Sequence, residues 1–251
     1  MTRAPARSWS QAVAMVPGGG TWPVDGLLPD ASVGQRPTGI VPLDEVMGGG
    51  VSPGEILALA GPPRAGVSRL AVRLALGIGR DASVCIVNGH LPTRRLLPVI
   101  DATGHDLGGD GPRTLDVASW MPLPDSPAHP AWFESTYDVV VVDCLDEMTT
   151  SHWVRTTSLS DVGRRLRECA RRSSTTLIIT GRSAAVDRGA AAGTTDRGPD
   201  GDVFDDVADV HLRLGGGGDD VELVEVEVRG GRRAVHRLSF SHTGVARLQP
   251  T

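Results

Sequence analysis

The chain has 251 residues, a formal net charge of −5, and 25 basic side chains, all of them arginine. This length suits one sizeable core with a small appendage, and the acidic balance argues against a generally basic nucleic-acid coat, although not against a local arginine patch. Three cysteines without paired spacing argue against a disulfide frame or a zinc site and indicate the cytoplasm, and no apolar run reaches the roughly 18 residues that span a membrane.

Residues 1–37 are punctuated by proline and glycine, which predicts a flexible N-terminal extension. From residue 38 to 251 the pattern predicts one domain in which strands and helices alternate. The expected strands are 54–60, 83–88, 114–118, 138–143 and 175–180, and the expected helices are 43–47, 68–80, 92–103 and 158–172.

The fold class follows from these elements. The run Val139–Val142 is wholly apolar, as in strands of a parallel sheet that is buried on both faces. Strands that alternate with helices predict an α/β fold, with a mostly parallel twisted sheet flanked by helices.

The end of the chain has a different pattern. Residues 183–204 are rich in small and polar side chains and predict a long loop. Segments 207–214, 221–229 and 232–240 then alternate, and Gly-Gly at 230–231 joins the last two. This predicts an antiparallel C-terminal hairpin that extends the sheet.

The segment Gly61–Ser68 has the spacing of a phosphate-binding loop, G-x-x-x-x-G-K-[ST], with Val67 in place of the lysine. Gly61 and Gly66 would let the backbone wrap a phosphate at a helix N-terminus, although a tight strand–helix turn also favours glycine. Arg64 is the cation within the loop. The sequence therefore predicts the backbone of a nucleotide site without its usual cation.

Asp143 ends a predicted buried strand about 80 residues after the loop. A carboxylate at this edge of a parallel sheet and the hydroxyl of Ser68 are oxygen ligands of the kind that Mg²⁺ prefers. Asp143 as a strand cap and Ser68 as a first-turn helix residue are the alternatives. We expect any binding of ATP or ADP and Mg²⁺ to be weak.

Read together, these segments resemble the RecA-like ATPases, and most closely the DnaB-type replicative helicases with their RadA and KaiC relatives. The resemblance spans about residues 38–248 and rests on the loop and three further stretches. These stretches are Thr38–Val51, which includes Gly-Gly-Gly at 48–50, Asp206–Val210, and Val228–Gly231.

The resemblance implies a damaged catalytic pattern. The acid that activates water would stand near His90, the γ-phosphate sensor would be Gly181, and the lysine shared with a neighbouring subunit would be Glu227. Arg229 resembles an arginine finger, so Arg229 and Asp143 are remnants of catalysis. Losing both a charge-assisted contact and a general base leaves little hydrolysis.

The hypothesis that the chain binds nucleic acid rests on its arginines. Arg182, Arg188 and Arg197 lie at or within the predicted loop and are the candidates for contact with DNA. The basic stretch 164–172 is read instead as a solvated helix face.

The resemblance implies a pseudo-ATPase of DNA metabolism, an accessory of replication, recombination or repair. It would act either by assembling with an active RecA-like or helicase homologue or by binding DNA or partner proteins. It could be a monomer, a homo-oligomer or a hetero-oligomer. A divergent, active DNA-dependent ATPase or helicase, in which Arg64 or an arginine of a neighbouring subunit replaces the lysine, is one alternative. A protein-interaction module that binds no nucleotide is the other.

Overall fold

In the computed structural model, the described residues are 34–62, 65–88, 93–107, 111–119, 137–145, 159–182, 207–215, 221–228, 232–241 and 244–250. Their helices are α1 (Val41–Met47), α2 (Val67–Ile78), α3 (Thr93–Asp106) and α5 (Leu159–Ser173). Their strands are β1 (Ile56–Gly61), β2 (Ser83–Asn88), β3 (Thr114–Ser119), β4 (Val139–Asp143), β5 (Thr176–Arg182), β6 (Val210–Gly215), β7 (Val221–Val228), β8 (Arg232–Ser241) and β9 (Gly244–Pro250).

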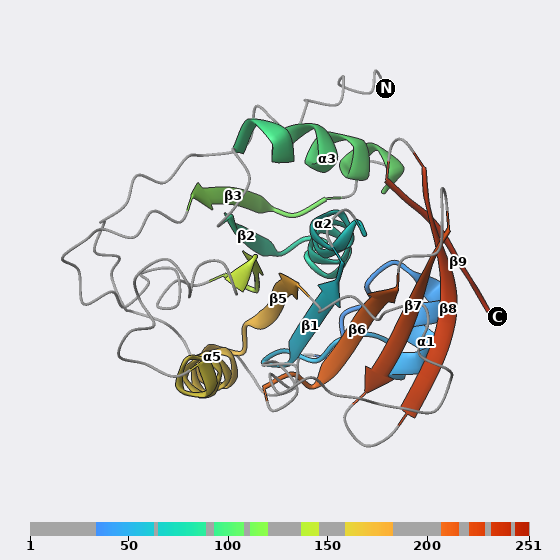
Figure 1. Cartoon of the computed structure of the whole chain (residues 1–251). Helices are drawn as coiled ribbons and strands as arrows, with labels where there is room; N and C mark the ends of the chain where they lie inside the picture. Colours follow the sequence, from blue (N-terminus) through green and yellow to red (C-terminus); the bar gives the residue numbers. More distant parts are fainter. Residues whose placement is uncertain are drawn as a thin grey trace.

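These strands form one nine-stranded sheet in the order β3-β2-β4-β5-β1-β6-β7-β8-β9 (Figure 1). Pairing is parallel from β3 to β6 and antiparallel from β6 to β9. This confirms the predicted fold class, a mostly parallel α/β sheet with an antiparallel C-terminal extension. The hairpin of β7 and β8 gains one further strand, β9, which the sequence did not predict.

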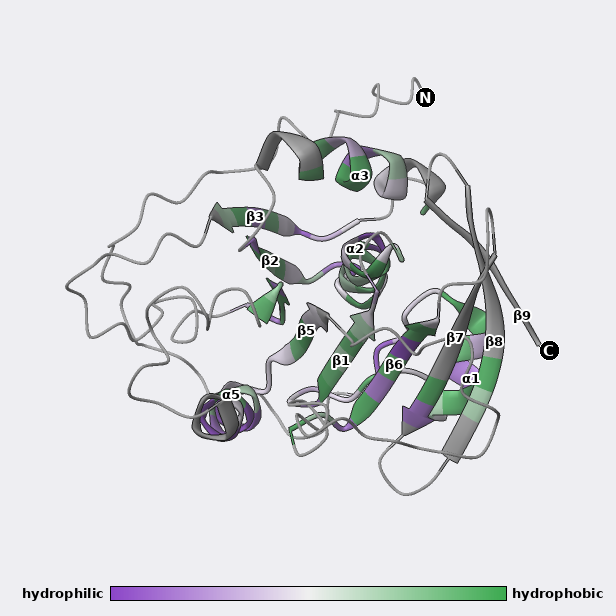
Figure 2. Cartoon of the chain, in the orientation of Figure 1, coloured by the Kyte–Doolittle hydropathy of each residue, from purple (hydrophilic) through white to green (hydrophobic). Residues whose placement is uncertain are grey.

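Helices cover both faces of the sheet, and alternate residues of β1 divide between two cores. Leu57 and Leu59 join the core that contains residues of α1, α2 and α3, whereas Ile56 and Ala58 join the core that contains residues of α5. Figure 2 shows the described residues of β1 in the hydrophobic colour along the strand. Burial on both faces explains why the strand is a continuous apolar run.

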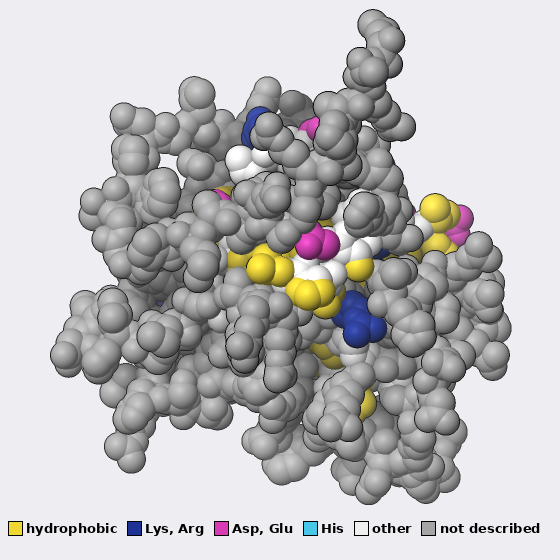
Figure 3. All heavy atoms as spheres, turned by 90° about the horizontal axis from the view of Figure 1, so that it is seen from above, with side chains coloured by type: hydrophobic (Ala, Val, Ile, Leu, Met, Phe, Trp, Pro, Cys, Tyr) yellow, Lys and Arg dark blue, Asp and Glu magenta, His cyan; other side chains and the backbone are white. Residues whose placement is uncertain are grey.

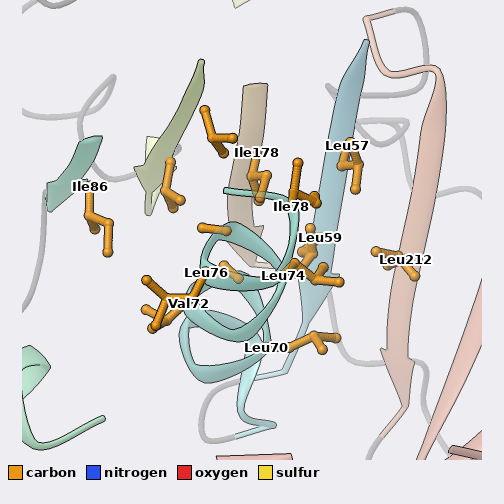
Figure 4. Packing of buried hydrophobic residues seen from close by; sticks show 14 of the residues in the cluster. Leu57, Leu59, Leu70, Val72, Leu74, Leu76, Ile78, Ile86, Ile178 and Leu212 are labelled. Carbon is orange, nitrogen blue, oxygen red and sulfur yellow. The ribbon is translucent and has the colours of Figure 1, made fainter. Parts of the chain in front are cut away.

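Helix α2 is the centre of the larger core. Figure 4 shows Leu74 and Ile78 of α2 beside Leu59 of β1 and Ile178 of β5. All four side chains are at most 2% exposed. The helix that follows the phosphate-type loop is therefore held against the middle of the parallel sheet.

The chain before β1 packs closely on α2. A Cβ added at Gly77 would lie 1.8 Å from the carbonyl oxygen of Thr38, so only glycine fits there. The Asp44 carboxylate in the first turn of α1 accepts hydrogen bonds from the backbone N–H of Thr38 at 2.8 Å and from its hydroxyl at 2.7 Å. These contacts give a structural role to the Thr38–Asp44 part of the sequence motif.

A polar cluster lies at the opposite end of the parallel strands, where β4 begins. The Asp138 carboxylate accepts hydrogen bonds from the backbone N–H and hydroxyl of Ser83 and from the Arg36 guanidinium, at 2.7–2.8 Å. Burial alone would raise the pKa of Asp138, but the Ser83 and Arg36 contacts outweigh it and lower the pKa below its usual value. Arg36, which the sequence assigns to the N-terminal extension, also pairs with Val51 in an isolated antiparallel bridge.

No helix in the described part of the chain is long and apolar enough to cross a membrane.

Candidate functional site

The loop between β1 and α2 has the geometry of a strand–glycine–helix turn. Gly61 ends β1, and Gly66 caps α2 with a φ of +82°, a left-handed conformation that glycine adopts without strain. The loop closes through a 3.1 Å hydrogen bond from the Ala65 N–H to the Pro62 carbonyl. Arg64, the candidate cation of the loop, lies outside the described residues.

Val67 turns its side chain toward the sheet at the base of this loop. It packs against the larger core as a partly buried residue. A Cβ added at Gly61 would lie 2.9 Å from Cγ2 of Val67 and 3.0 Å from Cβ of Leu214 on β6. The position where the family pattern has a phosphate cation is thus an apolar contact between α2, β1 and β6.

Asp143 and Ser68, the two predicted oxygen ligands of Mg²⁺, meet at the carboxyl edge of the sheet. The Ser68 hydroxyl donates a 2.8 Å hydrogen bond to Oδ1 of Asp143, a residue that is 2% exposed. Oδ2 of Asp143 is also buried and accepts no hydrogen bond from the described residues. A buried carboxylate oxygen without a donor is costly unless a cation, water or ligand meets it.

Thr180, which the sequence analysis did not single out, completes this cluster. Its hydroxyl donates to the same Oδ1 of Asp143 at 2.7 Å and accepts from the backbone N–H of Cys144 at 2.8 Å. Asn88 ends β2 in register with Asp143 and is 3% exposed. The signal that could have identified Thr180 is its hydroxyl near the end of an apolar strand whose neighbours carry the loop and the acid.

The oxygen atoms of this cluster are of the kind that Mg²⁺ prefers. Ser68 Oγ and Asp143 Oδ2 are hard oxygen ligands, and Oδ2 accepts no hydrogen bond from the described residues. Within the described segments, there is no group of three or more His, Cys, Asp or Glu side chains that could hold a metal ion. The turn at Gly66 leads into the N-terminus of α2, where helices favour anions, whereas Val67 places no positive charge there.

The other predicted site residues divide into two groups. Gly181 is a buried residue of β5 in register with Ala60, and Arg182 ends β5 in register with Gly61. Glu227 pairs with Arg213 of β6 at 3.1 Å, so its charge is balanced within the same chain. The residues that lie outside the described part are His90, Arg188, Arg197 and Arg229.

Helix α5 presents arginines to solvent, as the sequence predicts. Arg164, Arg165, Arg171 and Arg172 are exposed. Arg164 forms a 3.3 Å ion pair with Glu168 one turn on, and exposed pairs of this kind contribute little to stability. On another face, seen from above in Figure 3, the described side chains that reach the surface include hydrophobic, acidic and basic groups together.

Comparison with known proteins identifies the fold but not a family. No family model and no curated protein matches the sequence. The flagellar accessory protein FlaH from Methanocaldococcus jannaschii matches with a TM-score of 0.58 and 17% identity, over 84% of this chain and 96% of FlaH. The RadB recombinase matches with a TM-score of 0.59 and 17% identity, over 86% of this chain and all of RadB.

These similarities and the strand order define the fold class. The chain has the RecA-like P-loop fold. The phosphate-type loop follows β1, an acid ends β4, and β5 lies between these two strands in the sheet. FlaH is a flagellar accessory protein and RadB a recombinase, so proteins with different roles share this fold.

Proposed function

We propose that this chain is a RecA-like, DnaB-helicase-related pseudo-ATPase that acts as an accessory of DNA metabolism. The observation that carries the proposal is the apolar environment of the Val67 side chain. Its side chain is part of an apolar contact at the base of the loop, while the adjacent Ser68 donates a hydrogen bond to Asp143. That hydrogen bond supports a metal-side role for the pair.

The roles of the remaining residues follow from this arrangement. Ser68 and Asp143 would hold Mg²⁺, and the turn at Gly66 with the N-terminus of α2 would face a phosphate. Bound Mg²⁺ supplies charge neutralisation between the phosphates. What the chain lacks at Val67 is a side-chain donor to the phosphates, so binding depends on the backbone and the helix dipole.

The expected rate follows from the substituted positions. A charge-assisted hydrogen bond contributes about 1.5–3 kcal/mol, and a transition-state arginine about 10³–10⁵ in rate. By the family resemblance, the site has lost the phosphate lysine at Val67 and the γ-phosphate sensor at Gly181. The lysine supplied to a neighbour stands as Glu227, which is paired with Arg213. Weak binding without ordinary turnover is the expected result.

The role in DNA metabolism is supported by the helicase-like segments of the sequence and by similarity to the structure of the RadB recombinase. Arg182, at the end of β5, lies on the same sheet edge as the loop, because it is in register with Gly61. With Arg188 and Arg197 it is the proposed contact to single-stranded DNA. Assembly with an active RecA-like homologue would supply the catalytic groups that this chain lacks.

Calorimetric titration with ATP, ADP and Mg²⁺, with and without single-stranded DNA, tests the proposal. We expect weak binding that Asp143→Ala reduces only when Mg²⁺ is present. Arg64→Ala is the matched test of the divergent active ATPase, because only that alternative makes Arg64 essential for ATP binding. If ATP, ADP and DNA all fail to bind and leave the melting temperature unchanged, the chain is an interaction module and the proposal is wrong.

A further inference from the structure

We propose that Thr180 is a positioning residue, which fixes the Asp143 carboxylate and the strained backbone after it so that one carboxylate oxygen stays available to a cation. The inference deepens the proposed function and rests on it for the role of Asp143. It assigns different roles to the two hydroxyl groups that donate to Asp143. The Thr180 hydroxyl keeps its hydrogen bond when a cation binds, whereas the Ser68 hydroxyl can give up its hydrogen bond to the cation.

The direction of the hydrogen bonds around Thr180 is fixed by chemistry. The backbone N–H of Cys144 can only donate, so the Thr180 hydroxyl accepts from it at 2.8 Å. The single hydroxyl hydrogen of Thr180 is then directed at Oδ1 of Asp143, 2.7 Å away. Thr180 is 1% exposed and Asp143 2% exposed, so water does not compete readily for either contact.

The backbone conformation of Cys144 explains why its hydrogen bond to Thr180 is needed. Cys144 has a φ of +62°, a left-handed conformation that side chains other than glycine, asparagine and aspartate seldom adopt. Such a residue persists where the surrounding structure holds it, and often at functional sites. The Thr180 hydroxyl holds this residue through its N–H, and so sets the direction in which the end of β4 turns.

The same geometry divides the two oxygens of Asp143. Ser68 and Thr180 both donate to Oδ1, and no described residue donates to Oδ2. Ser68 lies in the first turn of α2, where its oxygen is itself a candidate ligand, so this contact can give way to a cation. Thr180 lies on the neighbouring strand β5 and keeps the carboxylate orientation whether Ser68 remains or leaves.

Thiol labelling without any ligand directly tests whether Thr180 holds Cys144. In Thr180→Val, alkylation of Cys144 by iodoacetamide, followed by mass spectrometry of its peptide, should be roughly 2- to 10-fold faster, the ratio that corresponds to one lost hydrogen bond. Thr180→Ser keeps the hydroxyl and should label at the wild-type rate. Cys85 is an internal slow reference, because burial and the nearby Asp116 raise its pKa to about 12.

A wild-type labelling rate in Thr180→Val, or equal acceleration in Thr180→Ser, overturns the proposal. If Thr180→Val does not fold, amide exchange of the wild-type protein decides instead. The Cys144 N–H should then be protected like the interior of β4, and exchange at the rate of an open loop overturns the inference.

Metal binding supplies the second measurement. Titration with ADP should show that Thr180→Val weakens the Mg²⁺-dependent part of binding and leaves metal-free binding unchanged, with Thr180→Ser restoring it. Equal loss with and without Mg²⁺ contradicts a positioning role. If the wild-type chain binds no nucleotide, the proposed function fails, while the labelling result still decides whether Thr180 holds Cys144 and Asp143.

Discussion

At the scale of single residues, Gly61 and Val67 share one small space at the base of the loop. A Cβ at Gly61 would lie 2.9 Å from a methyl group of Val67 and 3.0 Å from Cβ of Leu214. The substitution at Val67 is therefore more than a missing charge, because it adds an apolar contact between the helix and the sheet. That contact makes two predictions.

Gly61→Ala should lower the free energy of unfolding by about 1–3 kcal/mol, because the added methyl group meets Val67 and Leu214 at about 3 Å. Urea unfolding measures the change. Removing the opposing methyl groups in Gly61→Ala/Val67→Ala should recover part of the loss. Additive losses in the double variant would mean that the two side chains do not compete for the same space.

Val67→Lys should raise ATP affinity by about 10- to 100-fold, the effect of restoring a charge-assisted hydrogen bond of about 1.5–3 kcal/mol. The lysine stem can follow the apolar surface that Val67 now covers while its ammonium reaches the loop. Calorimetry measures the affinity, and Val67→Leu is the uncharged control. Equal affinities of the lysine and leucine variants would show that the loop no longer faces a phosphate.

Ser68 and Asp143 were both singled out from the sequence, and they lie within hydrogen-bond distance because the carboxyl ends of parallel strands meet at one edge of the sheet. The sequence was not sufficient to predict Thr180 or the Arg36–Asp138 pair. Those contacts depend on which strand lies next to β4 and on where the chain before α1 passes, and neither is encoded in local spacing.

At the scale of elements, α2 is fixed by contact with the chain before α1 as well as by its apolar side chains. Gly77 allows the Thr38 carbonyl to approach the helix backbone. Most elements were predicted within a few residues because their apolar runs are long. Strand β9 was missed, because Gly244–Pro250 is a short, mixed segment that becomes a strand by pairing with β8.

Gly77→Ala should destabilise the protein by about 3 kcal/mol or more, because the new Cβ would lie 1.8 Å from a backbone oxygen that cannot rotate away. The midpoint of thermal unfolding reports the change. Gly34→Ala is the matched control, since a Cβ at Gly34 meets no atom within 4 Å. A similar midpoint for both variants would contradict the close packing of Thr38 on α2.

The start of β4 predicts a pH dependence. The pKa of Asp138 is lower in the folded chain than in the unfolded chain, so its contribution to stability is complete above the unfolded pKa of about 3.9 and is lost as the pH falls through the folded value. Asp138→Asn should lower unfolding free energy at pH 7 by about 1–3 kcal/mol. The difference from wild type should shrink toward pH 3.

Urea unfolding between pH 7 and pH 3 measures this dependence. Glu168→Gln is the control, because Glu168 forms an exposed pair with Arg164 and should change stability little at either pH. A difference for Asp138→Asn that stays constant across the range would show that the carboxylate charge contributes nothing.

At the scale of the whole molecule, the chain combines a RecA-like sheet with a candidate site that matches the expected pattern only in part. The scaffold elements of that site, the glycine turn, Ser68 and Asp143, are in place. The polar and charged side chains that the family resemblance calls for would stand at Val67, Gly181 and Glu227. This contrast between the scaffold and the substituted positions is what our proposal of a pseudo-ATPase rests on.

ATP turnover by the purified chain with Mg²⁺ and single-stranded DNA tests the central claim most directly. The prediction is that phosphate release stays at the background of the Asp143→Ala variant, with or without DNA. Turnover at the rate of an ordinary helicase, abolished by Asp143→Ala, would contradict the assignment as a pseudo-ATPase and would favour a divergent active enzyme.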